Sequence, residues 1–198
     1  MNKEILENFY LTKKLSVSQV AKKFSCSENK INYWLARYKI KKRTISEAIY
    51  QYKNPKGDPF SFKYPRSSSE IFLFGLGLGL FWGEGSKRST HSLRLSNSDP
   101  VLVRKFIDFL VSIYNIDRKK LRFQLQIYDD LDLNKSVNFW AKILSVKKSQ
   151  FFKTTILERR GNGTYLTKMK HGVVILYFSN IKLRNLICSQ IANIENLS

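Results

Sequence analysis

The sequence predicts an α+β fold with two domains: an all-helical domain over residues 1–52 and a domain of mixed helices and strands over 70–198, joined by a linker over 53–69. Apolar residues recur at helical spacing through the first 45 residues. Alternation of apolar and polar residues, which is typical of strands, begins only after residue 90. Three of the four prolines and a run of three serines separate the two patterns, and such punctuation indicates a linker.

Helical and strand-like segments alternate in the second domain. The expected order is a helix over 70–84, a strand over 91–97, a helix that starts after Asp99-Pro100 and runs to about 114, a strand over 121–128, a helix over 133–144, strands near 150–157 and 172–178, and a last helix over 181–195. No segment repeats, so the domain is expected to fold as one unit.

Charge is the strongest compositional feature. Lys and Arg total 35 against 15 Asp and Glu, which gives a formal net charge of +20. The excess is even, because residues 1–69 carry 15 basic and 5 acidic side chains, and residues 70–198 carry 20 and 10. Such a field attracts polyanions. Nucleic acid is the leading candidate, and an anionic membrane surface is the alternative.

The apolar segments and cysteines indicate the compartment. The one long apolar run, Ile71 to Trp82, is about half the length needed to cross a bilayer, so we expect a buried helix. Cys26 and Cys188 are too few for a disulfide framework or a zinc cluster, which fits a reducing cytosol. No signal peptide is expected at the amino terminus. We therefore expect a soluble cytoplasmic protein, nucleoid-associated if bacterial or archaeal, with no membrane partner and no small-molecule substrate.

Residues 17–36 carry two short helical patterns with a turn between them. Ser16 and Ser27 stand at the two positions where a hydroxyl can cap a helix, and the small Ala21 stands where the helices approach. The segment resembles the helix-turn-helix family over about 45 residues, with Ser25 where the family usually has Gly. The alternative is a small helical bundle that contacts proteins.

The helix-turn-helix resemblance implies that the second helix enters the major groove of DNA. The side chains that it carries over as base readers are Glu28, Asn29, Lys30, Asn32 and Tyr33, with Arg37 nearer the phosphates. The basic residues that follow are expected to hold the DNA backbone or a minor groove, and they are Lys41, Lys42 and Arg43.

The segment Phe74–Lys87 holds five of the nine glycines of the chain. Glycine costs about 1 kcal/mol against alanine in a helix, so a helix with this many needs a compensation. Three of these glycines, Gly75, Gly79 and Gly83, are four residues apart and form a stripe without side chains. Such a stripe lets a second helix approach closely. The alternative partner is another helix of the same chain.

The glycine helix ends in Glu84, and Gly85 is expected to stop it. Residues 79–85 resemble the signature helix of LAGLIDADG homing endonucleases, with Trp82 in place of the first Asp, Gly83 in place of Ala, and Glu84 in place of the metal-binding Asp. The resemblance implies that two such helices pack side by side and that Glu84 and Gly85 hold Mg²⁺ or Mn²⁺ beside the scissile phosphates. Because the chain has one signature helix, the carboxylate pair requires a homodimer.

The same resemblance implies a LAGLIDADG-like α/β domain over about 70–195, with a saddle-shaped antiparallel sheet in the major groove. The helix at 133–144 lies outside the minimal fold. Apolar residues of 121–128 alternate with polar ones, and Gln and Arg suit adenine and guanine edges. The DNA-binding candidates of this domain are Lys87, Arg94, Arg122, Gln124, Gln126, Lys168 and Lys170. Gln126 and Lys153 are candidate catalytic residues beside Glu84. Lys168, Lys170 and His171 are expected at a hairpin tip with 161–163.

Three functions follow from these expectations. The first is a homodimeric, site-specific double-strand DNA endonuclease of the homing type, which hydrolyses phosphodiesters with divalent metal. The second is a DNA-binding transcriptional regulator that keeps the LAGLIDADG scaffold without cleavage. A third is assistance of intron RNA splicing.

Overall fold

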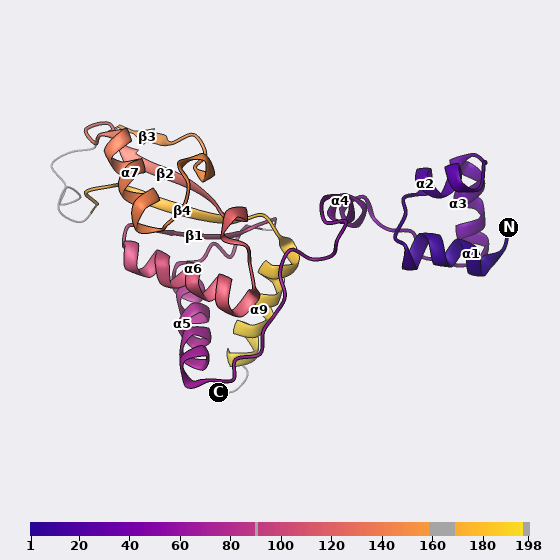
Figure 1. The fold of residues 1–198 in the computed structure, drawn as a ribbon, viewed down its shortest axis with the longest axis horizontal. Coiled ribbons are helices and arrows are strands. Elements are labelled where there is room, and N and C mark those ends of the chain that lie inside the picture. Colours follow the sequence, from indigo (N-terminus) through magenta and orange to yellow (C-terminus); the bar gives the residue numbers. More distant parts are fainter. Residues whose placement is uncertain (90, 159–168, 196–198) are drawn as a thin grey trace. The chain divides into compact units, whose positions relative to one another are not determined.

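The computed structural model describes residues 1–89, 91–158 and 169–195. The chain forms two compact units, an amino-terminal unit of Met1–Asp58 and a carboxy-terminal unit of Pro59–Ser198 (Figure 1). In the described part of the chain, each helix is too short or too polar to cross a membrane.

The amino-terminal unit is built from short helices around a small core. Its elements are α1 (Lys3–Glu7), a π-helical turn (Asn8–Thr12), α2 (Val17–Lys23), α3 (Glu28–Arg37) and α4 (Ile45–Lys53). The core side chains are Leu6, Tyr10, Val20, Ala21, Ile31, Leu35 and Ile40. The all-helical expectation for this part of the chain therefore agrees with the structure, and α4 extends the helices beyond residue 45.

Hydroxyl side chains cap the amino-terminal ends of α2, α3 and α4, and the sequence predicts the caps of α2 and α3. Ser16 Oγ accepts the backbone N–H of Gln19, and Ser27 Oγ accepts that of Lys30, over 3.1 and 3.3 Å. Thr44 caps α4 in the same way. Each cap satisfies an amide that has no partner inside its helix, which fixes where these short helices begin.

The carboxy-terminal unit follows the expected order of helices and strands. Its elements are α5 (Ser68–Glu84), β1 (Leu93–Asn97), α6 (Pro100–Tyr114), a 3-10 turn (Arg118–Lys120), β2 (Arg122–Tyr128), α7 (Leu133–Ile143), a second 3-10 turn (Lys148–Gln150), β3 (Thr155–Leu157), β4 (Val173–Phe178) and α9 (Ile181–Glu195). The strand expected near 150–157 is shorter than predicted: a 3-10 turn ends at Gln150, and the pairing of β3 with β2 begins only at Thr155.

The four strands form one mixed sheet in the order β1-β4-β2-β3. The pairs β1–β4 and β2–β4 are antiparallel, but β2 and β3 are parallel. The prediction of a wholly antiparallel sheet is therefore wrong at this edge. Helix α7 connects β2 to β3, and a crossover through a helix returns the chain in the same direction, whereas a tight hairpin would reverse it.

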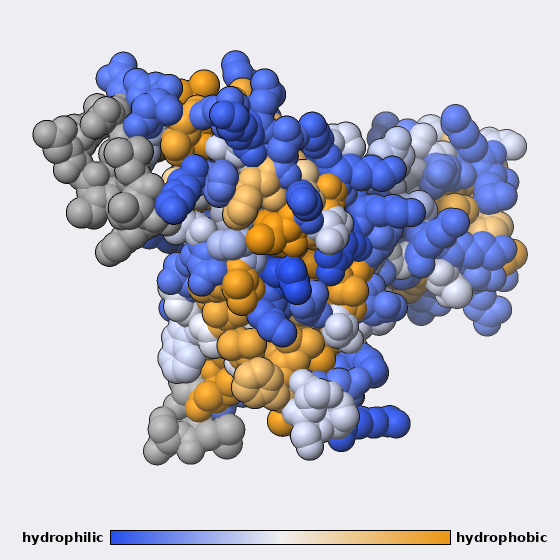
Figure 2. All heavy atoms as spheres, turned by 60° about the vertical axis from the view of Figure 1, so that its left-hand side comes forward, coloured by the Kyte–Doolittle hydropathy of each residue, from blue (hydrophilic) through white to orange (hydrophobic). Residues whose placement is uncertain are grey.

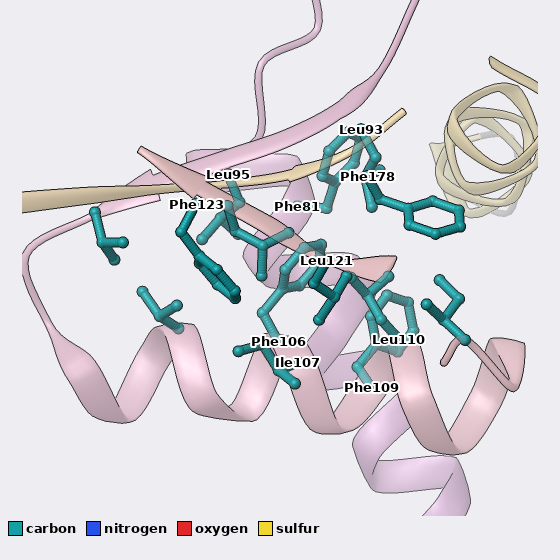
Figure 3. Close-up of a cluster of buried hydrophobic side chains, with 14 of the residues drawn as sticks. Phe81, Leu93, Leu95, Phe106, Ile107, Phe109, Leu110, Leu121, Phe123 and Phe178 are labelled. Atoms are coloured by element: carbon teal, nitrogen blue, oxygen red, sulfur yellow. The ribbon is translucent and has the colours of Figure 1, made fainter. Parts of the chain in front are cut away.

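The sheet buries one face and leaves the other open. Leu93, Leu95, Phe123 and Phe178 point from the strands toward α6 (Figure 3), which adds Phe106, Ile107, Phe109 and Leu110 to the same cluster. Trp140 of α7 is also fully buried in this cluster. The alternate residues of β1, β2 and β4 are exposed or half-buried, so in the described residues the opposite face is accessible.

Part of the expected linker packs on the second unit. The backbone N–H groups of Ser61 and Lys63 donate to the carbonyl oxygens of Tyr114 and Ile113 over 3.0 and 2.8 Å. The ring of Phe62 lies against Tyr114 with 5.6 Å between ring centroids. Residues 61–63 therefore follow the end of α6 in an extended conformation, and the break between the units falls after Asp58.

Candidate functional site

Helix α5 presents a face that packs against no other part of the protomer that the structure describes. A Cβ built at Gly75, Gly79 or Gly83 meets no atom within 4 Å. Phe72 and Trp82 lie beside this stripe on the helix surface and are 68% and 41% exposed. Figure 2 shows apolar side chains gathered on the lower part of the carboxy-terminal unit, at the height of α5 and α9 in Figure 1. The open stripe is thus flanked by apolar side chains that are free for a contact.

The opposite face of α5 packs inside the unit. Leu78 and Phe81 are buried in the core. Gly77 belongs to this face, since a Cβ there would lie 2.1 Å from Cγ of Phe109 in α6. The glycines of α5 therefore serve two contacts: Gly77 admits α6 closely, and the other three leave the outer face bare. The intramolecular contact involves Gly77, which lies outside the stripe of Gly75, Gly79 and Gly83.

Glu84 is the last residue of α5, and its side chain is exposed. In the described residues it has no ion-pair partner. Gly85 does end the helix, but in an extended conformation with φ −76° and not in the left-handed one. Glycine is needed there for space, because a Cβ would lie 2.3 Å from the carbonyl oxygen of Phe81.

The end of α5 is tied to the edge of the sheet. Gly85 forms an antiparallel bridge with Leu95, and Ser86 N–H donates to the carbonyl oxygen of Arg94 over 2.9 Å. The guanidinium of Arg184 in α9 donates to the carbonyl oxygen of Lys87. These contacts fix the backbone that follows Glu84 relative to β1 and α9.

A shallow open hollow of about 320 Å³ lies beside Glu84 on the outer face of α5, and it is lined by Gly79, Trp82, Gly83 and Lys87. It joins the glycine stripe to the side chain of Lys87. A basic group therefore lies at the foot of the stripe, three residues after Glu84 in the sequence.

Gln126 and Lys153 do not lie beside Glu84 in one protomer. Strands β1 and β4 separate β2 from Gly85, which is three strand spacings, or roughly 14 Å at the usual distance between strands. Lys153 precedes β3, at the far edge of the sheet. The expected catalytic set is therefore not assembled within one chain.

The metal-binding capacity of one protomer is small. The described residues contain no group of three or more His, Cys, Asp or Glu side chains that could hold an ion. Glu84 and the carbonyl oxygen of Gly85 offer oxygen ligands alone. Mg²⁺ is commonly held by one or two carboxylates together with water and substrate phosphates, so this donor set fits half of a shared site.

The open face of the sheet carries a hydrogen-bonded set of polar side chains. Tyr177 donates to Oε1 of Gln124 over 2.7 Å, and Nε2 of Gln124 donates to Thr155 over 3.0 Å. The guanidinium of Arg94 lies over the ring of Tyr177, 5.1 Å from its centroid. Arg122 turns back to the carbonyl oxygen of Lys119 over 2.7 Å. The face is therefore basic and able to hydrogen-bond, as the alternation in β2 predicts.

The central strand of this face, β4, was not among the sequence candidates. Its outward residues are Val173, Ile175 and Tyr177, all half-buried. The sequence Val-Val-Ile-Leu-Tyr-Phe is apolar throughout, so alternation could not mark one side as exposed. Only the pairing of β4 between β1 and β2 shows that these three side chains lie among the polar candidates.

In the amino-terminal unit, α3 exposes most of the predicted DNA-reading residues. The exposed ones are Glu28, Asn29, Lys30, Tyr33 and Arg37, and Asn32 is half-buried. Arg37 donates to the hydroxyl of Tyr33 over 2.9 Å. Ser25 adopts φ +49°, so the turn before α3 has the left-handed conformation that Gly usually supplies.

The basic run after α3 divides into two kinds of residue. Lys41 and Lys42 are exposed. Arg43 instead holds the unit together: its guanidinium donates to the carbonyl oxygens of Lys14 and Leu15 and lies 4.2 Å from the ring centroid of Tyr10. The two lysines are available to a polyanion, whereas the Arg43 side chain is already engaged.

The expected hairpin tip is only partly described. Lys168 and residues 161–163 lie outside the described residues. Lys170 is exposed. The ring of His171 stacks on Phe139 with 3.7 Å between centroids, and its carbonyl oxygen accepts the indole N–H of Trp140 over 2.8 Å. His171 is therefore part of the contact between α7 and the start of β4.

No family model, curated protein or solved structure matches this chain.

Proposed function

We propose that the chain is a homodimeric, divalent-metal-dependent, site-specific double-strand DNA endonuclease similar to LAGLIDADG homing endonucleases. In this proposal the outer faces of two α5 helices pack together and bring two Glu84 carboxylates to the foot of the interface. The helix-turn-helix formed by α2 and α3 adds a second DNA contact.

The observation that carries the proposal is the open glycine stripe of α5. Among the described residues, Gly75, Gly79 and Gly83 make no contact that would require glycine, because a Cβ at each would meet no atom within 4 Å. Each glycine also costs helix stability relative to alanine. Close packing against an identical helix would offset that cost. In a two-fold symmetric dimer, the same glycine surface of each copy would form the interface.

The ends of the two helices supply the chemistry. Two Glu84 carboxylates and two Gly85 carbonyl oxygens offer a set of oxygen ligands of the type that suits Mg²⁺. Bound metal would polarise the scissile phosphate and activate a water molecule. Lys87, at the hollow beside the stripe, is placed to hold an adjacent phosphate by charge.

Both units offer surfaces for the duplex. The open sheet face carries Arg94, Gln124 and Tyr177, and α3 exposes Lys30 and Arg37. Binding through both is consistent with the even spread of the charge of +20 along the chain. Phosphate contacts from the lysines and arginines would make affinity fall steeply with salt.

Cleavage of a random duplex pool tests the proposal. The full chain is incubated with the pool in Mg²⁺ or Mn²⁺, and new DNA ends are sequenced. We expect ends at one roughly palindromic site, loss of cleavage in Glu84→Gln with DNA binding retained, and full cleavage in the matched control Glu158→Gln. Cleavage that survives Glu84→Gln, or that comes from a monomer on DNA, contradicts the proposal.

A non-cleaving DNA-binding regulator is the second candidate. It is favoured by the separation of Gln126 and Lys153 from Glu84, which leaves no assembled set of three catalytic side chains in one protomer. Specific duplex binding by the full chain without new ends in either metal would select this function.

A further inference from the structure

Gln124 of β2 and Ile175 of β4 are direct neighbours in the antiparallel pair, and Ser96 of β1 completes the row. Directly opposite residues in such a pair have Cβ atoms roughly 4.5–5.5 Å apart. Gln124 and Ile175 are half-buried on the open face of the sheet. The row therefore presents a carboxamide and a branched apolar side chain side by side.

The amide of Gln124 is held from both sides. Its Oε1 accepts from Tyr177 over 2.7 Å, and its Nε2 donates to Thr155 over 3.0 Å. A glutamine amide has two N–H groups and an oxygen with two lone pairs, so one donor and one acceptor position remain. The two partners fix the amide plane before any ligand arrives, which lowers the entropy lost on binding.

One base pair complements this row. In the major groove an A·T pair offers the N7 acceptor and N6 amino donor of adenine, next to the C5-methyl group of thymine. A glutamine amide can pair with N6 and N7, and an apolar side chain can cover the methyl group. A G·C pair fits less well. Its guanine presents two acceptors, N7 and O6, but Gln124 has only one free N–H to donate, and the cytosine amino group would lie near the apolar side chain of Ile175.

We propose that Gln124 and Ile175 together read one A·T base pair, with Gln124 on the adenine edge and Ile175 on the thymine methyl group. The inference rests on the proposed function, since it takes duplex DNA as the ligand of the open sheet face. Tyr177 and Thr155 are positioning residues, because they act on the base through the Gln124 amide.

Base analogues in the selected site test the pair. The full chain first selects its site from random duplexes in EDTA, and dissociation constants are then measured at one fixed salt concentration. At one A·T pair of each half-site, uracil in place of thymine should weaken binding about threefold to fivefold, since it removes one buried methyl group. Replacing adenine by 7-deazaadenine at the same pair should weaken binding roughly fivefold or more, because it removes the N7 acceptor.

Variants connect each base atom to its side chain. Ile175→Ala should bind the thymine and uracil sites equally, and Gln124→Ala should bind adenine and 7-deazaadenine equally. Val173→Ala, on the same strand and face, is the matched control and should keep both preferences. Each comparison is between two DNA sites bound by the same variant. A general loss of stability or affinity in that variant would therefore affect both sites equally and would leave their affinity ratio unchanged.

Two outcomes separate this inference from the proposed function. Specific duplex binding in which no A·T pair responds to both analogues overturns the inference and leaves the function standing. Absence of duplex binding, or tighter binding of the corresponding single strand at equal salt, overturns both. A response to the analogues that persists unchanged in Ile175→Ala and Gln124→Ala assigns the readout to other residues and overturns the inference.

Discussion

The backbone of Gly77 lies directly against the ring of Phe109, where an added Cβ would come within 2.1 Å of Cγ. Two residues along the same helix, Gly79 faces empty space. Helix α5 therefore uses glycine on its inner face for a close contact with α6, whereas the glycines of its outer face are open among the described residues. In the proposed dimer this open space would take up a second α5 helix. The two kinds of glycine should respond oppositely to the same substitution.

Gly77→Ala should destabilise the folded protein. Alanine favours a helix over glycine by about 1 kcal/mol, but displacing a packed ring costs about 1–3 kcal/mol, so we expect a net loss of up to about 2 kcal/mol. Urea unfolding of the full chain measures it. Gly75→Ala, at an open position of the same helix, should be neutral or stabilising by up to about 1 kcal/mol. Equal stabilities of the two variants would show that α5 and α6 do not pack as described.

Gly79→Leu should separate folding from self-association. The position is open in the protomer, so unfolding in urea should show a stability equal to or above that of the parent chain. A bulky side chain in the stripe would hold two α5 helices apart, so the dimer on DNA should weaken by tenfold or more (about 1.4 kcal/mol). Sedimentation of the DNA complex measures this. A dimer unaffected by Gly79→Leu would exclude the stripe as the interface.

Arg43→Ala should lower stability, whereas Lys42→Ala should lower DNA affinity. Removing the Arg43 guanidinium leaves the carbonyl oxygen of Leu15 without its donor and takes away one of the two donors to that of Lys14, which Gln51 also contacts. We expect this loss to cost roughly 1–3 kcal/mol of unfolding free energy. Lys42 is exposed, so its removal should leave stability unchanged and reduce the salt dependence of binding by about one phosphate contact. Thermal unfolding and salt-dependent binding of both variants check this; identical behaviour of the two would contradict it.

Glu70 should make the stability of the carboxy-terminal unit depend on acid pH. A hydrogen bond from Lys63, followed by those from the backbone N–H groups of Arg66 and Ser67, lowers the pKa of the Glu70 carboxyl from 4.5 to about 2. Because the folded pKa lies below the unfolded one, the contribution is complete above pH 4.5 and disappears as pH falls toward 2.

The check is thermal unfolding of the parent chain and of Glu70→Gln between pH 2 and 6. The midpoint difference between them should be largest near pH 6 and should close as pH approaches 2. Glu158→Gln should show no such closing difference. A constant offset across the range would mean that Glu70 is not specifically stabilised in its charged form.

The order of helices and strands could be predicted from local sequence, because caps and periodicity act over a few residues. Ser16 and Ser27 each accept a backbone N–H at a helix start, as their positions predict. Strand direction is different. The parallel pairing of β3 with β2 depends on where α7 returns the chain, which no pattern within β3 specifies.

The sequence predicts those parts of the candidate site in which the residue type alone determines the structural role. The open stripe of α5 follows from glycine spacing alone. Arg43 looked like its neighbours Lys41 and Lys42, and only the fold places Tyr10 and the carbonyl oxygens around its guanidinium. Gln126 and Lys153 were chosen by residue type, and the strand order separates them from Glu84.

The distance between the two copies of residue 84 on DNA tests the central claim most directly. In a Cys26→Ser, Cys188→Ser background, a nitroxide label on Glu84→Cys reports this distance by double electron–electron resonance. Packed helices lie about 8–10 Å apart, so with selected DNA we expect one narrow distribution below roughly 25 Å once the label arms are included. A label at Asn134 of α7 should give a longer distance. Absence of dipolar coupling at residue 84, or a distance beyond roughly 40 Å, would show that the two carboxylates do not meet and would contradict the account.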